Sequence, residues 1–342
     1  MSKEIGNLKY VSLGVLVLQT TSLVLLMRVS RRVPEEDLYL ASTAVVLAEL
    51  MKLVACLLMV FFESGDFRVF YEVLHSHILS KPVDTIKVAV PAFLYTIQNN
   101  LLYLALSNLD AATYQVTYQL KILTTALFSV LLLGRKLNML KWFSLTLLFA
   151  GVALVQLPQG EPSEDEPRIG LTAVVGVGAV IAACLTSGFS GVYFEKILKG
   201  SDVSLWLRNI QLGFFGFLFA LAGTYTYDGR AVLETGFFHG YTNTVWIVVI
   251  LQAFGGLVIA VVIKYADNIL KGFATSISIV LSCLLSYFLL DDFIPTIYFL
   301  IGAVLVMVAV FLYSLPNTSV PPHNPHPVSQ TEGTDKPRIP PT

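Results

Sequence analysis

Long apolar runs alternate with short polar segments along most of this chain. Each run is about 20 residues long, which is the length of a helix that crosses the hydrocarbon core of a bilayer. The pattern therefore predicts an all-α polytopic membrane protein with ten transmembrane helices. These predicted spans lie near residues 8–27, 40–62, 86–106, 111–133, 139–158, 170–194, 206–226, 244–264, 270–290 and 296–314.

The polar segments indicate how the chain divides. One of them is acidic and contains Pro162 and Pro167, and it separates two groups of five predicted helices. After Pro316 the sequence is rich in Pro, Ser, Thr and Asn without an apolar period, which is typical of disorder. The predicted parts are an N-terminal half 1–158, a linker 159–169, a C-terminal half 170–316 and a cytosolic tail 317–342.

A weak internal repeat relates the two halves. Lys121 begins an apolar half-span that leads to a charged hairpin, Arg135-Lys136, and Lys271 begins another that leads to Asp291-Asp292. Because five is an odd number, the second copy would enter the membrane in the opposite direction to the first. We therefore expect two inverted five-helix repeats, each with one lysine at a similar place.

Composition agrees with a membrane protein, since 55% of the residues are hydrophobic and only 13% are charged. Soluble proteins carry about 25% charged residues. The net charge of -1 gives no reason to expect a nucleic-acid partner. The cysteines and histidines lack metal-ligand spacing, so we expect neither a metal nor a cofactor. Basic residues outside the spans are concentrated on the side of the N-terminus, which predicts that both termini are cytosolic.

Lys121 is the most informative polar residue because it falls within a predicted span. Tyr114, Tyr118 and Lys121 are spaced i, i+4 and i+7, so one helix would carry them on one face. An ammonium group at the centre of a span costs about 2.5–3.5 kcal/mol on insertion scales. We therefore expect Lys121 to face a water-filled cavity that an anion visits.

Lys271 is the second cation of this kind. In an inverted repeat it would meet Lys121 near the middle of the bundle, where two ammonium groups repel each other unless an anion joins them. A diphosphate would balance the pair, and each lysine would act as a point-charge donor. The alternative is that Lys271 lies at a helix end and extends its ammonium group to the membrane interface.

Several other polar residues in the spans are candidate ligand contacts. Tyr95 and Asn99 share a helix face, and an aromatic ring beside an amide suits a nucleobase. The alternative for Asn99 is a hydrogen bond between helices. Ser187 lies in a small-residue segment that favours close packing, although it could reach a phosphate or ribose. Asn209 is either a ligand contact or a helix cap.

Two charge pairs are candidate gates. Glu49 and Lys52 are three residues apart and can pair within one helix, either for structure or for gating. Glu195 and Lys196 follow the sixth span, and they can pair with the segment 264–268 at the cytosolic side. The spans contain no phosphate-cradling loop, nucleophile elbow or paired acid–base carboxylates, so an enzyme is not expected.

At these residues the sequence resembles the nucleotide-sugar transporters of the Golgi, within the drug/metabolite transporter superfamily. The similarity covers nearly all of residues 7–315. The matching stretches are Tyr95 through Asn100, Leu106 through Ala112, Tyr114 through Thr125, Gly191 through Lys196, and Lys264 through Phe273.

The resemblance implies ten helices in two inverted halves, a Golgi or ER membrane, and exchange of a cytosolic nucleotide sugar for a lumenal nucleoside monophosphate. It also implies a central site, and the matching positions are Tyr95, Asn99, Tyr114, Lys121, Ser187, Asn209 and Lys271. The CMP-sialic acid branch differs near the base, where this chain has Gly213, Ile259 and Ala260. The chain looks more similar to the UDP-N-acetylglucosamine and UDP-galactose branches.

The resulting hypothesis is an antiporter of the Golgi membrane that imports a UDP-sugar into the lumen in exchange for UMP by alternating access. A second hypothesis is a proton-coupled exporter of small molecules that uses Glu49. A third is a non-transporting scaffold that holds glycosyltransferases. The expected partners are the UDP-sugar, UMP and the lipid bilayer, and a homo-oligomer or a glycosyltransferase complex is an open alternative.

Overall fold

The structure is a computed structural model that describes residues 2–31, 33–109, 114, 117–155, 171–289 and 295–315. All regular elements within these residues are helices, which confirms the all-α prediction. The predicted linker 159–169, the predicted tail 317–342 and the charged pair Asp291-Asp292 lie outside the described residues.

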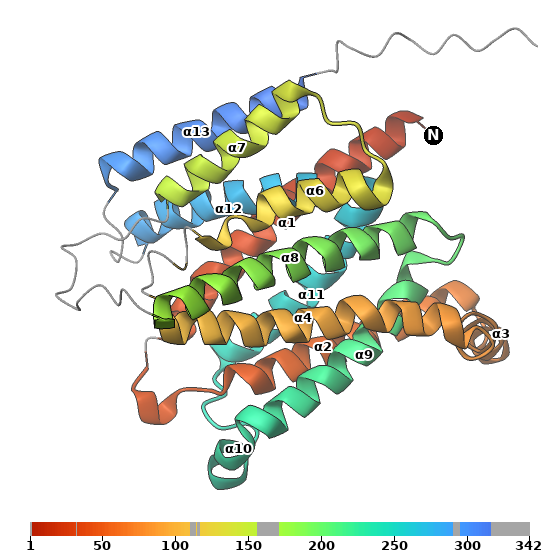
Figure 1. The fold of residues 1–342 in the computed structure, drawn as a ribbon. Coiled ribbons are helices and arrows are strands. Elements are labelled where there is room, and N and C mark those ends of the chain that lie inside the picture. The colour runs from red at the N-terminus through yellow and green to blue at the C-terminus, as the bar shows by residue number, and fades with distance from the viewer. Residues whose placement is uncertain are drawn as a thin grey trace, which may run out of the picture.

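The α-helices have different lengths and partners, and Figure 1 shows them as one bundle. They are α1 (Ser2–Ser30), α2 (Ala41–Ser64), α3 (Phe67–Leu74), α4 (Pro82–Asn108), α6 (Lys121–Leu133), α7 (Met139–Val155), α8 (Leu171–Lys199), α9 (Leu205–Tyr227), α10 (Gly229–Thr235), α11 (Asn243–Tyr265), α12 (Asn268–Leu289) and α13 (Ile297–Ser314). Short 3-10 and π-helical segments lie at Glu35–Asp37 and His75–Leu79.

Seven of these helices are long and apolar enough to cross a membrane, by length and composition: α1, α2, α8, α9, α11, α12 and α13. Helices α6 and α7 are apolar but have only 13 and 17 residues. Helix α4 has 27 residues and carries the polar tract that begins at Tyr95. Each predicted span overlaps one of these helices, while ten transmembrane helices and the inverted repeat remain predictions.

Two segments expected to be loops contain short helices. Helix α3 follows α2 directly, and the Asp66 side chain caps it by accepting a hydrogen bond from the Arg68 N–H at 3.4 Å. Phe70 and Leu74 of α3 pack beside Cys56 of α2. Helix α10 follows α9 in the same way. A search for apolar runs of about 20 residues does not detect such short amphipathic helices.

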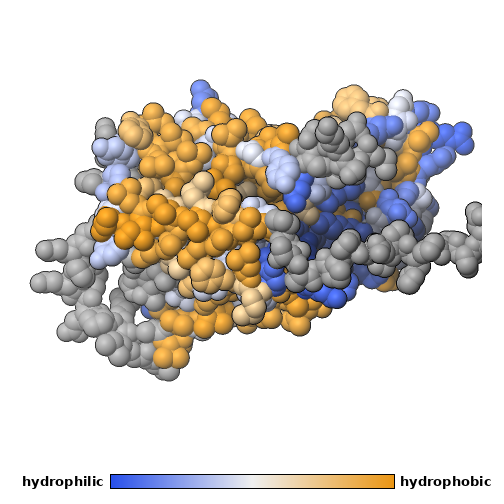
Figure 2. Space-filling model, turned by 90° about the horizontal axis from the view of Figure 1, so that it is seen from above, coloured by the Kyte–Doolittle hydropathy of each residue, from blue (hydrophilic) through white to orange (hydrophobic). Residues whose placement is uncertain are grey.

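The connections between the helices gather at two ends of the bundle. The N-terminus, α3, and the α6–α7 and α8–α9 connections lie at the end on the right of Figure 1, which is called the N-terminal end below. Helix α10 lies at the opposite end. In Figure 2, hydrophobic atoms cover much of the molecule and hydrophilic residues gather toward the N-terminal end. This distribution is typical of a bundle whose sides contact lipid.

Helices from the two halves of the chain pack against each other throughout the bundle. Helix α4 packs on α8 and α9, and α6 packs on α8. In the same way α1 packs on α11 and α12, and α2 packs on α11 and α9. Helices α7 and α13 pack on each other with Gly151 and Gly302 backbone to backbone. The described helices of the two predicted halves are therefore interleaved in one bundle.

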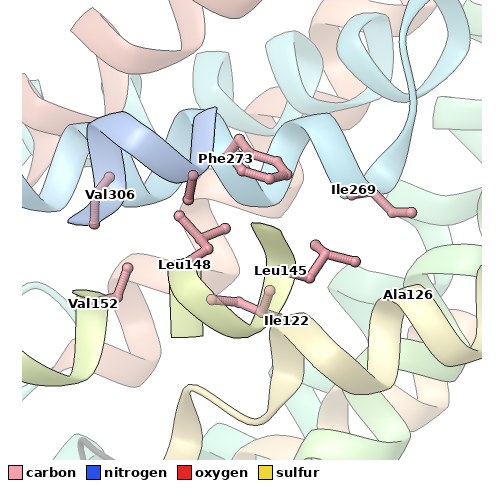
Figure 3. Packing of buried hydrophobic residues seen from close by; sticks show 9 residues of the cluster. Ile122, Ala126, Leu145, Leu148, Val152, Ile269, Phe273 and Val306 are labelled. Atoms are coloured by element: carbon pink, nitrogen blue, oxygen red, sulfur yellow. The ribbon is translucent and has the colours of Figure 1, made fainter. Parts of the chain in front are cut away.

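One apolar cluster holds α6 and α12 together beside the candidate lysines. Figure 3 shows Ile122 of α6 and Ile269 and Phe273 of α12, packed with leucines and valines of α7 and α13. Ile122 follows Lys121 directly, and Ile269 and Phe273 each lie two residues from Lys271. The buried side chains of this cluster thus fix the two helix starts that carry the lysines.

Candidate functional site

The backbone breaks just before Lys121. The sequence predicts a continuous helix over 111–133, but Gln119 and Leu120 form a turn and α6 begins at Lys121. Two backbone hydrogen bonds that each span three residues, instead of the four of an α-helix, mark the break. The Leu120 N–H donates to the Thr117 carbonyl and the Ile122 N–H donates to the Gln119 carbonyl, each at 3.0 Å. Irregular backbone at membrane depth needs partners inside the protein. The Cys184 thiol supplies one by donating to the Tyr118 carbonyl at 3.4 Å.

Tyr114, Tyr118 and Lys121 lie together despite this break. The rings of Tyr114 and Tyr118 stack at a centroid distance of 5.9 Å and an angle of 10°. The Lys121 ammonium group lies 4.3 Å from the centroid of the Tyr118 ring. Such cation–π contact stabilises a desolvated ammonium group by about 2 kcal/mol, so these aromatic rings help to hold Lys121 inside the bundle.

The hydroxyl group of Tyr118 connects this cluster to α4 and α8. It accepts a hydrogen bond from the Gln98 amide at 3.0 Å, and Ser187 interacts with the same hydroxyl. Tyr95 lies deep in the bundle one turn before Gln98. Gln98 lies within the stretch Tyr95 through Asn100 but is not among the predicted site residues, and its hydrogen bond to Tyr118 adds it to the candidate site. The side chain of Asn99 is not among those that the structure describes.

Helices α6 and α12 pack against each other at the residues beside Lys121 and Lys271, so the two ammonium groups lie within range of electrostatic repulsion. Both lysines lie deep among the helices, yet each keeps part of its surface accessible. Within the described ranges, no carboxylate lies at ion-pair distance from either ammonium group. The structure thus brings the two lysines together as a cationic centre that lacks a close counter-ion.

The two lysines lie at the starts of α6 and α12. Lys121 is the first residue of α6, and Lys271 lies in the first turn of α12, where its N–H donates to the Asp267 carbonyl at 3.0 Å. The first N–H groups of α12 already have acceptors, because Asn268 donates to the Glu195 carboxylate and Leu270 donates to the Asp267 carboxylate. An anionic ligand would therefore be bound by the two ammonium groups and not by the start of α12.

Asn209 lies in another environment. It is 1% exposed, and its amide group donates to the Leu205 carbonyl of its own helix at 2.9 Å. The contacts described for this side chain therefore tie it to α9. They do not connect it to the group formed by Tyr118, Lys121 and Ser187.

Glu49 and Lys52 form an ion pair at 2.5 Å on α2. Glycines on two neighbouring helices make room for it. A Cβ atom at Gly216 of α9 would lie 2.6 Å from the Glu49 carboxylate, and one at Gly256 of α11 would lie 2.9 Å from the Lys52 side chain. Lys52 is 7% exposed, so the pair is mostly removed from solvent.

We expect Lys52→Ala to lower the stability of the protein more than the double variant Glu49→Gln/Lys52→Met does. The single change leaves the Glu49 carboxylate in a poorly hydrated place without its cation, a loss of roughly 3–5 kcal/mol in buried pairs. The double change removes both charges. Thermal unfolding in detergent measures the difference, and an equal loss in the two variants would contradict it.

Glu195 pairs with cations other than its neighbour Lys196. Its carboxylate is fully buried and binds Arg135, from the α6–α7 connection, and Lys199. Lys196 is exposed. Residues i and i+4 share a helix face whereas i and i+1 do not, so the spacing from Glu195 to Lys199 is the signal that sequence reasoning missed. The Glu195 carboxylate also accepts a hydrogen bond from the Asn268 N–H at 3.0 Å, as expected for contact with the segment 264–268.

A bundle in which seven of the described helices are long and apolar enough to cross a bilayer indicates a multi-pass membrane protein. Sequence comparison is more specific, because the nucleotide-sugar transporter family matches residues 4–314. The chain therefore belongs to the nucleotide-sugar transporter family. Because this family consists of transporters, the expectation that the chain is not an enzyme is confirmed.

Named relatives agree with this assignment. The chain is 62% identical over 310 residues to the UDP-N-acetylglucosamine transporter of Homo sapiens, covering 90% of this chain and 95% of that protein. It is 56% identical over 315 residues to the UDP-galactose translocator of Mus musculus, covering 92% and 80%. A crystal structure with 16% identity aligns with a TM-score of 0.62 over 92% of this chain and 98% of the other, which supports the fold alone.

Proposed function

We propose that the protein carries a UDP-sugar into the Golgi lumen in exchange for UMP. The observation that supports this most directly is the pairing of Lys121 and Lys271 inside the bundle without a close carboxylate. A ligand diphosphate would lie between the two ammonium groups and remove their repulsion. Each lysine would donate charge-assisted hydrogen bonds, which are roughly twice as strong as neutral ones.

The nucleobase would lie near Tyr95, Asn99 and Tyr114. Tyr95 and Tyr114 are both partly accessible. Stacking of a base on an aromatic ring contributes about 1–3 kcal/mol in other nucleotide-binding proteins. Ser187, close to the Tyr118 hydroxyl, would contact the phosphate or ribose. Asn209 joins this list on family resemblance alone, because its amide group is bonded within α9.

Exchange of these ligands needs no ion gradient. A diphosphate diester carries about two negative charges at neutral pH, and UMP carries nearly the same because the second pKa of a phosphomonoester is about 6. The exchange would therefore move almost no net charge. The same two lysines would bind both ligands, so UMP would return through the site that the UDP-sugar had left.

The packing of the helices supports the proposal of two inverted halves. The first half supplies α1, α2, α4, α6 and α7, and the second supplies α8, α9, α11, α12 and α13 in the same order. In an inverted repeat, a contact between two helices implies a contact between the two helices that correspond to them. The α4–α8 contact then corresponds to the α11–α1 contact, and the α6–α8 contact corresponds to the α12–α1 contact. The α4–α9 contact corresponds in the same way to the α11–α2 contact, and all of these helix pairs are in contact in the structure. Rocking of symmetry-related helices around a central site would give alternating access.

The orientation in the membrane would follow from the basic residues. Arg68, Lys81, Arg135 and Lys199 lie outside the apolar parts of the helices toward the N-terminal end. An excess of Lys and Arg in short loops marks the cytosolic side. We therefore propose that this end and both termini are cytosolic. Membership of the nucleotide-sugar transporter family supports the Golgi as the membrane.

The relatives favour UDP-N-acetylglucosamine over UDP-galactose as the carried sugar. Identity to the human UDP-N-acetylglucosamine transporter is 62%, against 56% to the mouse UDP-galactose translocator. The proton-coupled exporter hypothesis drew on Glu49, which is already paired with Lys52. Nothing in the described contacts favours that hypothesis or a scaffold without transport.

Counterflow into proteoliposomes tests the proposal. Vesicles preloaded with UMP should take up labelled UDP-N-acetylglucosamine, labelled UDP-galactose or both, while vesicles preloaded with CMP or buffer should not. The reason is that only UMP can leave through the uracil site and return the carrier. Uptake that follows a pH gradient without internal nucleotide would contradict exchange, and binding partners without any uptake would favour a scaffold.

A further inference from the structure

Glu195 is the centre of a group of charged contacts that the proposed exchange does not by itself explain. The side chain is fully buried near the end of α8. Its carboxylate binds Arg135, the Lys199 ammonium group at 2.8 Å and the Asn268 N–H at 3.0 Å. A buried carboxylate needs such partners, because desolvation of an unpaired one is costly.

The contacts of this group join separate elements at the N-terminal end of the bundle. Arg135 follows α6, and its second guanidinium nitrogen lies 3.4 Å from the Asp267 carboxylate between α11 and α12. Lys199 of α8 donates to the Ala266 carbonyl at 2.6 Å. We call Arg135, Glu195, Lys199, Asp267 and Asn268 the latch. It binds the α6–α7 connection and α8 to the α11–α12 connection at this end.

The latch is built to hold α12 in one position. Asp267 uses one carboxylate oxygen for Arg135 and the other to cap α12, by accepting from the Leu270 N–H at 2.7 Å. Gly191, one turn before Glu195 on α8, lies against the Asn268 side chain, where a Cβ atom would overlap it. The Asn268 side chain at the start of α12 therefore packs directly against the backbone of α8.

Lys271 connects the latch to the candidate site. It lies one turn after Asp267 on α12, and the Asn268 N–H, three residues before Lys271, donates to the Glu195 carboxylate at 3.0 Å. Glu195, which is bonded to the same helix start, would therefore balance the charge of Lys271 when the site holds no ligand. A phosphate group bound to Lys271 would take over this role, and the attraction between α12 and Glu195 would weaken.

We propose that the latch prevents the empty carrier from opening at this end, and that a bound phosphate on Lys271 releases it. This inference rests on the proposed exchange function. An exchanger must change its open side when loaded and must not do so when empty. A latch whose strength depends on the occupancy of Lys271 meets both requirements, because a ligand shifts a conformational equilibrium only by binding one state more tightly.

The test compares release of labelled UMP from proteoliposomes into buffer with release into buffer that contains UMP. The wild-type protein should release label slowly unless UMP is present outside. Glu195→Gln keeps the size of the side chain and an oxygen for the Asn268 N–H but loses the charge. The measured quantity is the rate of release without external UMP divided by the rate with external UMP. We expect Glu195→Gln to raise this ratio about tenfold, which corresponds to about 1.4 kcal/mol.

The matched control is Glu72→Gln, because Glu72 is an exposed carboxylate on α3 that pairs with Arg68 outside the latch. It should leave the ratio unchanged. Glu195→Gln protein that is stabilised by UMP against heat but has the wild-type ratio would overturn the inference. If that variant does not fold, Arg135→Gln decides in its place, since it removes the contact to Asp267 and should raise the same ratio.

The two proposals fail in different ways. Wild-type protein that binds UMP without any exchange would contradict the exchange function, and with it the need for a latch. Wild-type protein that exchanges UMP, together with latch variants that slow both kinds of release equally, would contradict the latch alone. A merely structural role of Glu195 predicts the second result.

Discussion

Replacement of either central lysine by alanine should abolish tight UMP binding and leave the empty protein at least as stable as before. Lys121→Ala and Lys271→Ala each remove one charge-assisted donor, an effect of about 1.5–3 kcal/mol, or roughly 10- to 150-fold in Kd. Each change also removes the repulsion between the two ammonium groups. We therefore expect an unchanged or higher melting temperature without ligand and a lost or strongly reduced shift with UMP.

A variant that loses affinity for UMP but keeps or raises its melting temperature without ligand identifies a ligand-binding lysine and not a structural one. A lysine that served the fold alone would lower the melting temperature of the empty protein when removed. The matched control is Lys87→Gln, because Lys87 is exposed and pairs with Asp84 at 2.9 Å near the start of α4. It should keep the wild-type Kd for UMP. Unchanged UMP affinity in both alanine variants would contradict the site.

The positions of most helices follow from apolar run length alone. For example, α11 and α13 coincide with predicted spans to within a residue or two, since a bilayer span needs a nearly uninterrupted apolar sequence. The break before Lys121 was not predictable in this way. It involves Cys184 of the distant helix α8, whose thiol donates to the Tyr118 carbonyl next to the break.

The candidate site shows the same division between local and long-range information. The grouping of Tyr114, Tyr118 and Lys121 was predictable from their spacing, and the structure brings them together. To predict that Lys271 lies near Lys121 required the internal repeat, because 150 positions separate the two residues in the chain. The contact of Gln98 with Tyr118 was not predictable, because sequence spacing does not specify which amide of a polar tract faces a given neighbour.

The charges at the N-terminal end were the hardest to assign. The sequence predicted contact of Glu195 and Lys196 with the segment 264–268, but a helix turns by about 100° per residue, so these two side chains point in different directions and only Glu195 reaches Asn268. Arg135 belongs to a connection with no regular spacing relative to Glu195. Its place opposite Glu195 results from the packing of α6 on α8, which only a three-dimensional structure provides.

Gly188→Ala should disrupt both the stability of the protein and its affinity for UMP. A Cβ atom at Gly188 of α8 would lie 2.8 Å from the Thr124 hydroxyl and 2.9 Å from backbone atoms of Thr124 and Thr125. Backbone cannot rotate away as a side chain can, so α6 would have to move away from α8. This movement would break the Thr124 hydrogen bond to the Cys184 carbonyl, which is 2.8 Å long, and displace Lys121.

The same substitution elsewhere on α8 isolates this steric effect. Gly178→Ala adds a Cβ atom that meets nothing within 4 Å, and the gain in helix propensity of about 1 kcal/mol applies to both glycines. We therefore expect Gly178→Ala to be neutral or stabilising, and Gly188→Ala to lose about 1–3 kcal/mol through overpacking. Thermal unfolding and UMP titration of the two variants measure the difference. Equal results would mean that α6 can move from α8 without cost, and the rigid placement of Lys121 would then be wrong.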